Sequence, residues 1–171
     1  MIKPGEITVL FGQPHSGKST LAWELKKALI ESEGISYPIV DGDEIRAIFK
    51  NGDYSREGRI RNLQRISDIA VYLAQQHERV IVAAVYPYKE AREYLDSQIK
   101  DVKWIHLSYD GVRGRETFHV KDFDHVFYGG NTYSINTSKN GTDECCQKIR
   151  LIHRPLPDAA RRAQVPIQKE D

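Results

Sequence analysis

The chain has 171 residues, enough for one domain that buries a single hydrophobic core. Its 25 Lys and Arg residues nearly balance its 24 Asp and Glu residues, so no bulk charge attracts nucleic acid or a membrane surface. No apolar run is long enough to span a bilayer, and the two cysteines, Cys145 and Cys146, are adjacent in a predicted helix, where a disulfide rarely forms. We therefore expect a cytoplasmic protein with reduced thiols and with no nucleic-acid or membrane partner.

Buried strands and amphipathic helices alternate along the chain. Four apolar runs and one shorter segment are predicted as strands, at residues 6–12, 37–43, 79–87, 103–109 and 133–138. Helical spacing of apolar residues predicts helices at residues 19–32, 44–49, 55–77, 88–100 and 141–152. Thr142 or Asp143 is the expected N-cap of the last helix. This order predicts an α/β fold in three layers, with a mostly parallel five-stranded sheet flanked by helices.

Two segments fall outside this alternation. Residues 111–131 have weak periodicity and several glycines, which is typical of a long functional loop. Residues 154–171 combine prolines with many charges, so we expect the folded domain at 1–153 and a mobile C-terminal tail at 154–171. Within the domain, Trp23 and Trp104 fall at apolar positions and are expected in the core.

A phosphate-binding loop is predicted directly after the first strand. The run GQPHSGKS satisfies the P-loop pattern G-x-x-x-x-G-K-S/T between a buried strand and a helix. Its backbone N–H groups and the positive helix end bind phosphates, Lys18 reaches the β- and γ-phosphates, and Ser19 binds Mg²⁺. Arg113 and Arg115 lie near the start of the segment 111–131, and we expect Arg115 to contact ATP. The expected ATP-binding residues are Gly12, Gln13, Pro14, His15, Ser16, Gly17, Lys18, Ser19, Thr20 and Arg115.

The rest of the chain narrows the class of P-loop protein. A GTPase needs an N-K-x-D base-reading motif, and the sequence contains none. The predicted strand at 79–87 lacks the acidic residue that ends a Walker B strand in ATPases. A small chain with these features is best interpreted as a small-molecule kinase with the P-loop NTPase fold, using ATP and Mg²⁺.

A second site is predicted where the second strand ends, at Asp41-Gly42-Asp43. Open α/β sheets bind ligands at the carboxyl ends of their strands. One of the two carboxylates is expected to order Mg²⁺ or its water and the other to accept the proton of the attacking hydroxyl, and Asp41 is the candidate Mg²⁺ ligand beside Ser19. Lys18, Asp41 and Asp43 are thus the candidate catalytic residues. Nearby arginines at 46, 59, 61 and 65 supply positive charge for an anionic acceptor.

The run VDGDEIRAIFKNGDYSREGRIRNLQRISDIA, at residues 40–70, resembles the region after the P-loop in adenylylsulfate (APS) kinases. The family pattern there is D-G-D-x-I/V-R, then an aromatic-Ser pair, an Arg and an Asn three residues later. Further on, VYPYKEARE and YSINTSKNGTDECCQKI resemble the family's segment after the third strand and its closing strand and helix. The likeness covers most of residues 5 to 153 in order.

The resemblance implies a reaction and an acceptor site. ATP and adenylylsulfate would give 3′-phosphoadenylylsulfate and ADP, in an enzyme that forms a homodimer. Asp43 would lie nearest the acceptor hydroxyl, while Arg46, Arg59 and Asn62 would hold the phosphate-sulfate and Tyr54 would pack against the base. The full set of residues expected to bind this small-molecule nucleotide acceptor is Asp43, Arg46, Tyr54, Arg59, Asn62, Arg65, Tyr86, Pro87, Phe118 and Lys121.

The sequence also departs from the family pattern. Pro14-His15 stands where the family loop has Gly or Ser, and residues 110–131 are shorter than the family's Lys-rich lid. In place of that lid, stacking and charge are expected from Phe118, His119, Lys121 and Phe123. The nearest alternative is the same fold acting on a different nucleotide conjugate, such as cytidine diphosphoramidate in capsule modification. A polynucleotide 5′-kinase would need a basic channel, and a non-catalytic nucleotide-binding subunit would not need Asp41 and Asp43.

Overall fold

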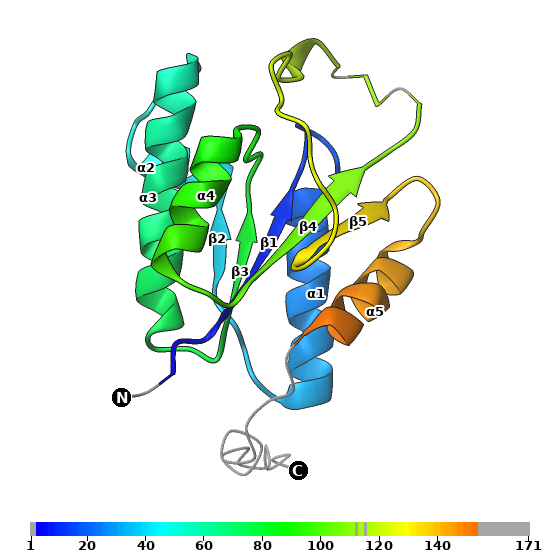
Figure 1. Ribbon diagram of the computed structural model, residues 1–171. Coiled ribbons are helices and arrows are strands. Elements are labelled where there is room, and N and C mark those ends of the chain that lie inside the picture. The colour runs from blue at the N-terminus through cyan, green and yellow to red at the C-terminus, as the bar shows by residue number, and fades with distance from the viewer. Residues whose placement is uncertain (1–2, 112, 115, 154–171) are drawn as a thin grey trace.

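The computed structural model describes residues 3–111, 113–114 and 116–153, which form a parallel sheet with helices on both faces (Figure 1). The strands are β1 (Glu6–Phe11), β2 (Ile39–Asp41), β3 (Arg79–Ala83), β4 (Val102–Ser108) and β5 (Thr132–Asn136). The helices are α1 (Lys18–Glu33), α2 (Gly42–Ile48), α3 (Arg56–Ala74), α4 (Lys89–Gln98) and α5 (Thr142–Ile152), with a short 3₁₀ turn at Glu116–Phe118. The strand order is β2-β3-β1-β4-β5, and every pairing is parallel. The predicted three-layer α/β fold is confirmed.

Both faces of the sheet are apolar, which explains why the strands lack alternation. Along β1, Val9 and Phe11 pack with the residues of α3 and α4, whereas Leu10 packs on the other face with α1 and α5. A parallel sheet covered by helices on both sides buries every strand position. All six residues of β1 are accordingly buried.

Two predicted strands are shorter than expected, for local reasons. Strand β2 ends at Asp41 because the Asp41 carboxylate caps α2, accepting hydrogen bonds from the N–H groups of Asp43 (2.9 Å) and Glu44 (3.4 Å). Strand β3 ends at Ala83, and the chain then turns through Tyr86, whose φ of 42° is left-handed rather than extended. Both strand ends thereby leave the sheet at its carboxyl edge, where polar groups gather.

Two residue-level predictions are wrong. Trp23 is 53% exposed, because Leu21, Ala22 and Leu25 are the residues that α1 turns toward the sheet. The N-cap of α5 is Gly141 rather than Thr142 or Asp143, which both lie inside the first turn. Trp104, by contrast, is buried as predicted, and its Nε1 donates to Asp96 (2.9 Å).

The loop and tail predictions have different outcomes. Residues between β4 and β5 form a long connection with one 3₁₀ turn, which lies above the carboxyl ends of the strands (Figure 1). The tail predicted at 154–171 lies outside the described residues. Among the helices that the structure describes, none is both long and apolar enough to cross a membrane.

A buried ion-pair cluster joins the amino ends of β1 and β3 to α1. Arg79 is 2% exposed; its Nε donates to Glu6 (3.1 Å) and its Nη1 to Glu33 (3.1 Å), while its guanidinium stacks on Tyr37. Burial and the positive charge of Arg79 lower the pKa of the adjacent His153 to about 3, so this imidazole is neutral. The cluster closes the end of the sheet opposite the polar edge.

Replacing Arg79 by Leu is expected to lower the free energy of unfolding by about 3–5 kcal/mol, because it removes the guanidinium that compensates the buried carboxylate of Glu6 and the partly buried carboxylate of Glu33. Urea unfolding followed by circular dichroism measures this change. Lys139→Leu, which removes an exposed pair with Asp110, is the matched control and should have little effect. Equal unfolding midpoints for the two variants would contradict the prediction.

Candidate active site

The P-loop lies between β1 and α1 and needs glycine at two positions. Gly12 has φ 148° and Gly17 has φ 94°, both in the region that favours glycine. A Cβ at Gly12 would also collide with the carbonyl oxygen of Leu107 on β4. Gly17 is the N-cap of α1, so the loop ends on the positive end of a long helix. The loop has the form that a phosphate cradle requires.

Lys18 is the one cation of the P-loop sequence, and its side chain is buried. Its Nζ donates to the carbonyl oxygen of Gln13 (2.7 Å) and to Ser16 Oγ (3.3 Å). Burial lowers the pKa of Lys18 to about 8, although the nearby carboxylates of Asp43 and Asp41 act in the opposite direction. The ammonium group therefore lies in a poorly solvated place, within electrostatic reach of both predicted carboxylates.

Asp41 and Ser19 meet across the site from different elements. Ser19 Oγ, at the start of α1, donates to Asp41 Oδ2 at 2.5 Å. The hydroxyl and the carboxylate are hard oxygen ligands, the type that Mg²⁺ prefers. No cluster of three or more His, Cys, Asp or Glu residues occurs in the described part of the chain, but Mg²⁺ in kinases needs few protein ligands, because waters and substrate phosphates complete its shell. This pair fits a Mg²⁺ site.

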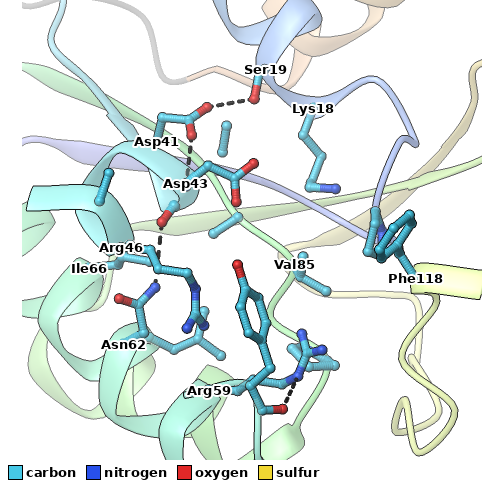
Figure 2. A pocket seen from close by; sticks show the side chains of 18 of the residues that line it. Lys18, Ser19, Asp41, Asp43, Arg46, Arg59, Asn62, Ile66, Val85 and Phe118 are labelled. Atoms are coloured by element: carbon cyan, nitrogen blue, oxygen red, sulfur yellow. Dashed lines mark hydrogen bonds between the residues drawn. The ribbon is translucent and has the colours of Figure 1, made fainter. Parts of the chain in front are cut away.

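One cavity of about 950 Å³ joins the two predicted sites (Figure 2). Figure 2 shows Lys18 and Asp43 beside the same space, with Phe118 on the side opposite Asn62. The predicted residues that line it are Pro14, His15, Gly17, Lys18, Ser19, Thr20, Asp41, Asp43, Arg46, Tyr54, Arg59, Asn62, Pro87 and Phe118. The P-loop and the segment 41–62 thus face one another across a single cavity.

Not every predicted site residue lies at the cavity. Tyr86 is fully buried, and its hydroxyl pairs with Ser67 Oγ (2.9 Å), so the structure places it in the core and not against the acceptor. Arg65 lies over the ring of Phe49 (4.9 Å), away from the residues that line the cavity. Gly12, Gln13 and Ser16 belong to the P-loop but do not line the cavity. Lys121 is exposed and does not line the cavity either. Arg115 lies outside the described residues.

The acceptor half of the cavity combines cations with an aromatic ring. Arg46 lies 4.3 Å from the centre of the Tyr54 ring and Arg59 lies 5.4 Å from it. Backbone carbonyls fix both guanidinium groups: Arg46 Nη1 donates to Asn51 (3.0 Å) and Asp53 (2.9 Å), and Arg59 Nε donates to Tyr54 (3.0 Å). Such a surface suits a ligand that has an aromatic part and a negative charge.

Asn62 brings an unsatisfied polar atom to the same wall. The residue is 4% exposed, and its Nδ2 donates to the carbonyl oxygen of Gly42 (3.5 Å). Among the buried atoms that the structure describes, its Oδ1 has no hydrogen-bond partner. A buried acceptor without a partner costs free energy, so a rotation of the amide that brings Oδ1 to a ligand hydroxyl would be favourable.

Arg113 contacts the P-loop, although Arg115 is the arginine that was predicted to contact ATP. Its Nη1 donates to the carbonyl oxygen of His15 (3.1 Å) and its Nη2 to Thr137 Oγ1 (3.0 Å). The guanidinium lies 4.2 Å from the Tyr109 ring and lines the cavity. Arg113 and Arg115 are two positions apart, and the sequence gives the same signal for both.

Comparison with known proteins connects this geometry to one family. The model of the family described as adenylylsulphate kinase matches residues 5–113. A probable adenylyl-sulfate kinase of Aeropyrum pernix is 41% identical over 92 residues, which are 53% of this chain and 50% of that protein. An adenylyl-sulfate kinase of Staphylococcus haemolyticus is 35% identical over 97 residues, 56% of this chain and 48% of that protein. The matched segments span about half the length of these curated relatives.

Solved structures extend the similarity of fold to most of the chain. The APS kinase of Mycobacterium tuberculosis in complex with AMPPNP and APS is 23% identical with a TM-score of 0.69. The superposition covers 88% of this chain and 98% of that chain. The fold match therefore reaches beyond residue 113, where the family match in sequence stops.

The lowered pKa of Lys18 predicts how nucleotide affinity depends on pH. Above about pH 8 the free protein loses the Lys18 proton, whereas bound phosphates favour the charged form, so binding must take up a proton. The affinity for AMPPNP should be flat below pH 8 and then fall by about tenfold per pH unit. Calorimetric titration between pH 7 and 10 measures it. The fall should be absent in Lys18→Arg, whose guanidinium stays charged; the same fall in that variant would contradict the assignment.

Proposed function

The chain belongs to the adenylylsulphate kinase family, and on that premise we propose that it transfers the γ-phosphoryl group of ATP to the 3′-hydroxyl of adenylylsulfate. The products are 3′-phosphoadenylylsulfate and ADP. The observation that most supports the proposal is the single cavity that joins the P-loop to Asp43, Arg46 and Arg59. A kinase must hold donor phosphate and acceptor hydroxyl in one water-poor space, and this cavity offers both halves.

In the proposed reaction, the P-loop half of the cavity stabilises the donor. The loop N–H groups and the α1 N-terminus bind the phosphates, and Lys18 moves from its own loop oxygens to the phosphate oxygens. Ser19 and Asp41 would hold Mg²⁺, which neutralises charge on the phosphates as they separate. Lys18 screens the charge that develops on the γ-phosphoryl group.

Asp43 is the proposed group that handles the acceptor's proton. It lies exposed in the first turn of α2 and beside Lys18, at the border of the two halves of the cavity. As the oxygen–phosphorus bond to the acceptor forms and the bond to the ADP oxygen breaks, the Asp43 carboxylate takes the hydroxyl proton. Positioning and charge compensation supply the remainder of the rate.

The acceptor half binds a nucleotide with an anionic group in this proposal. Arg46 and Arg59 hold the phosphate-sulfate, and the Tyr54 ring packs against the base. The unsatisfied Oδ1 of Asn62 favours a hydroxyl donor, so we assign Asn62 to a ribose hydroxyl rather than to the anion that the family resemblance suggested. Phe118 closes the opposite side of the cavity.

A second acceptor is favoured by one observation. The sequence match to the family ends at residue 113, before the segment that places Phe118 in the cavity wall, and that segment is shorter than the family's lid. Because this wall contacts the acceptor, a different nucleotide conjugate is the second candidate. Cytidine diphosphoramidate is the specific alternative that we name.

We also place the enzyme in the cytoplasm and propose a homodimer. Both cysteines, Cys145 and Cys146, are free and buried on α5, which agrees with a reducing compartment. The dimer is implied by the family resemblance alone. Light scattering coupled to size-exclusion chromatography measures the mass in solution.

An acceptor panel tests the proposed function. ADP release from ATP and Mg²⁺ should be fastest with adenylylsulfate and should fall to background without acceptor. Cytidine diphosphoramidate and a single-stranded oligonucleotide with a free 5′-hydroxyl are the competing acceptors. A higher kcat/KM for cytidine diphosphoramidate would replace the first assignment by the second. Turnover equal to wild type in Lys18→Ala would contradict the whole scheme.

Two substitutions separate chemistry from acceptor binding. Asp43→Asn removes the proton acceptor and should lower kcat by about 10²- to 10⁴-fold with little change in the KM for ATP. Arg59→Ala removes a charge-assisted contact and should raise the acceptor KM by roughly 10- to 100-fold. Arg61→Ala, which removes only an exposed pair with Asp53, is the control for Arg59. Steady-state kinetics with both substrates varied would reveal a reversed pattern, which would overturn these roles.

A further inference from the structure

Within the wall that places Phe118 at the cavity, Phe118 itself has little packing of its own. Phe118 is 64% exposed although it lines the cavity, and it ends a 3₁₀ turn of three residues, Glu116–Phe118. A side chain with so little burial of its own takes its position from the backbone on either side. The contacts that anchor residues 116–120 therefore determine the position of this wall.

The anchor on the carboxyl side is the amide of Gln13, a P-loop residue. Gln13 Nε2 donates to the carbonyl oxygen of Val120 (3.0 Å), and the N–H of Val120 donates to Gln13 Oε1 (2.8 Å). One planar amide thus pairs with both backbone groups of one residue, as a neighbouring strand would. Only Asn and Gln side chains offer a donor and an acceptor in this fixed arrangement, and the match is therefore specific.

The other anchors show what Gln13 adds. Earlier in the chain, Arg113 Nη1 donates to the carbonyl oxygen of His15, which is a separate contact to the P-loop. His119 pairs with the hydroxyl of Tyr109 (2.8 Å), and Asp122 pairs with Arg56 (3.3 Å), and these two contacts lead to β4 and α3 instead. Gln13 is the contact that joins Val120, two residues after Phe118, to the phosphate loop.

Gln13 also touches the donor side through its main chain. Its carbonyl oxygen accepts the hydrogen bond from Lys18 Nζ at 2.7 Å. The same residue therefore contacts the phosphate-binding lysine with its backbone and the acceptor wall with its side chain. Val120 itself is 5% exposed and packs in the hydrophobic core, so the residue that pairs with Gln13 has a well-defined position.

We propose that Gln13 is a positioning residue that fixes the wall formed by residues 116–120 on the P-loop and thereby holds Phe118 against the base of the nucleotide acceptor. It makes no contact with the reacting atoms and acts through Val120. The effect on acceptor binding rests on the proposed function, whereas the pairing of Gln13 with Val120 does not. Gln13 thus sets acceptor affinity from within the donor loop.

The first test needs no substrate. Amide hydrogen exchange by NMR is measured at Val120 in the wild-type chain, in Gln13→Leu and in the isosteric Gln13→Glu. The leucine removes both hydrogen bonds, so exchange should accelerate about tenfold, whereas the glutamate keeps the acceptor for the Val120 N–H and loses only the donor to the Val120 carbonyl, so its acceleration should be smaller. Gln147→Glu, on the exposed face of α5, is the matched control and should leave the rate unchanged.

The second test separates positioning from a general loss of structure. In Gln13→Leu the KM for adenylylsulfate should rise about tenfold, while the KM for ATP stays nearly unchanged because the loop backbone is intact. A merely structural defect would impair both substrates together. An unchanged Val120 exchange rate, or an acceptor KM equal to wild type, would overturn the proposal. Absence of activity with adenylylsulfate in the wild-type chain would contradict the proposed function, while the exchange rates would still test the pairing of Gln13 with Val120.

Discussion

The carboxylate of Asp41 is the interaction on which the site depends. One oxygen caps α2 through the N–H groups of Asp43 and Glu44, and the other accepts from Ser19 at the start of α1. A single buried side chain therefore fixes the direction of α2, which carries Asp43 and Arg46, relative to α1, the helix that follows the P-loop. Without this joint the donor and acceptor halves would belong to two separately placed helices.

The sheet order makes that joint possible. Strand β1 lies between β3 and β4, and the chain passes from one side of β1 to the other between those strands. The P-loop that follows β1 stands at this change of side, the usual ligand position in open α/β sheets. The segment after β2 then approaches the P-loop from one flank, and the segment after β4 approaches from the other (Figure 1). The cavity is a consequence of parallel strands that all end at one edge.

Local sequence patterns predicted what local physics determines. The P-loop spacing, the buried strands and the carboxylates at the end of β2 depend on backbone angles and on burial, and both leave periodic or fixed-distance signals. Trp23 was misplaced because similar apolar residues on α1 compete for the core and the rotation of the helix decides between them, whereas Tyr86 was expected at the acceptor and a left-handed backbone conformation at this residue accompanies its burial in the core. The pairing of Gln13 with Val120 spans 107 positions and depends on the fold of the loop after β4, so no pattern in either segment predicts it.

Lys18 shows how a bound phosphate would lower the free energy of the site. Its ammonium group is buried, and its hydrogen bonds go to a carbonyl and a hydroxyl, which compensate charge less than a carboxylate or phosphate does. The lowered pKa is the signature of that incomplete compensation. A phosphate group would supply the missing negative charge at the reacting end of the donor, where the binding free energy is most useful for catalysis. The carbonyl oxygen that Lys18 contacts belongs to Gln13. When a phosphate replaces this oxygen as the partner of Lys18, the hydrogen bond that is lost is therefore one to the residue that also holds the acceptor wall.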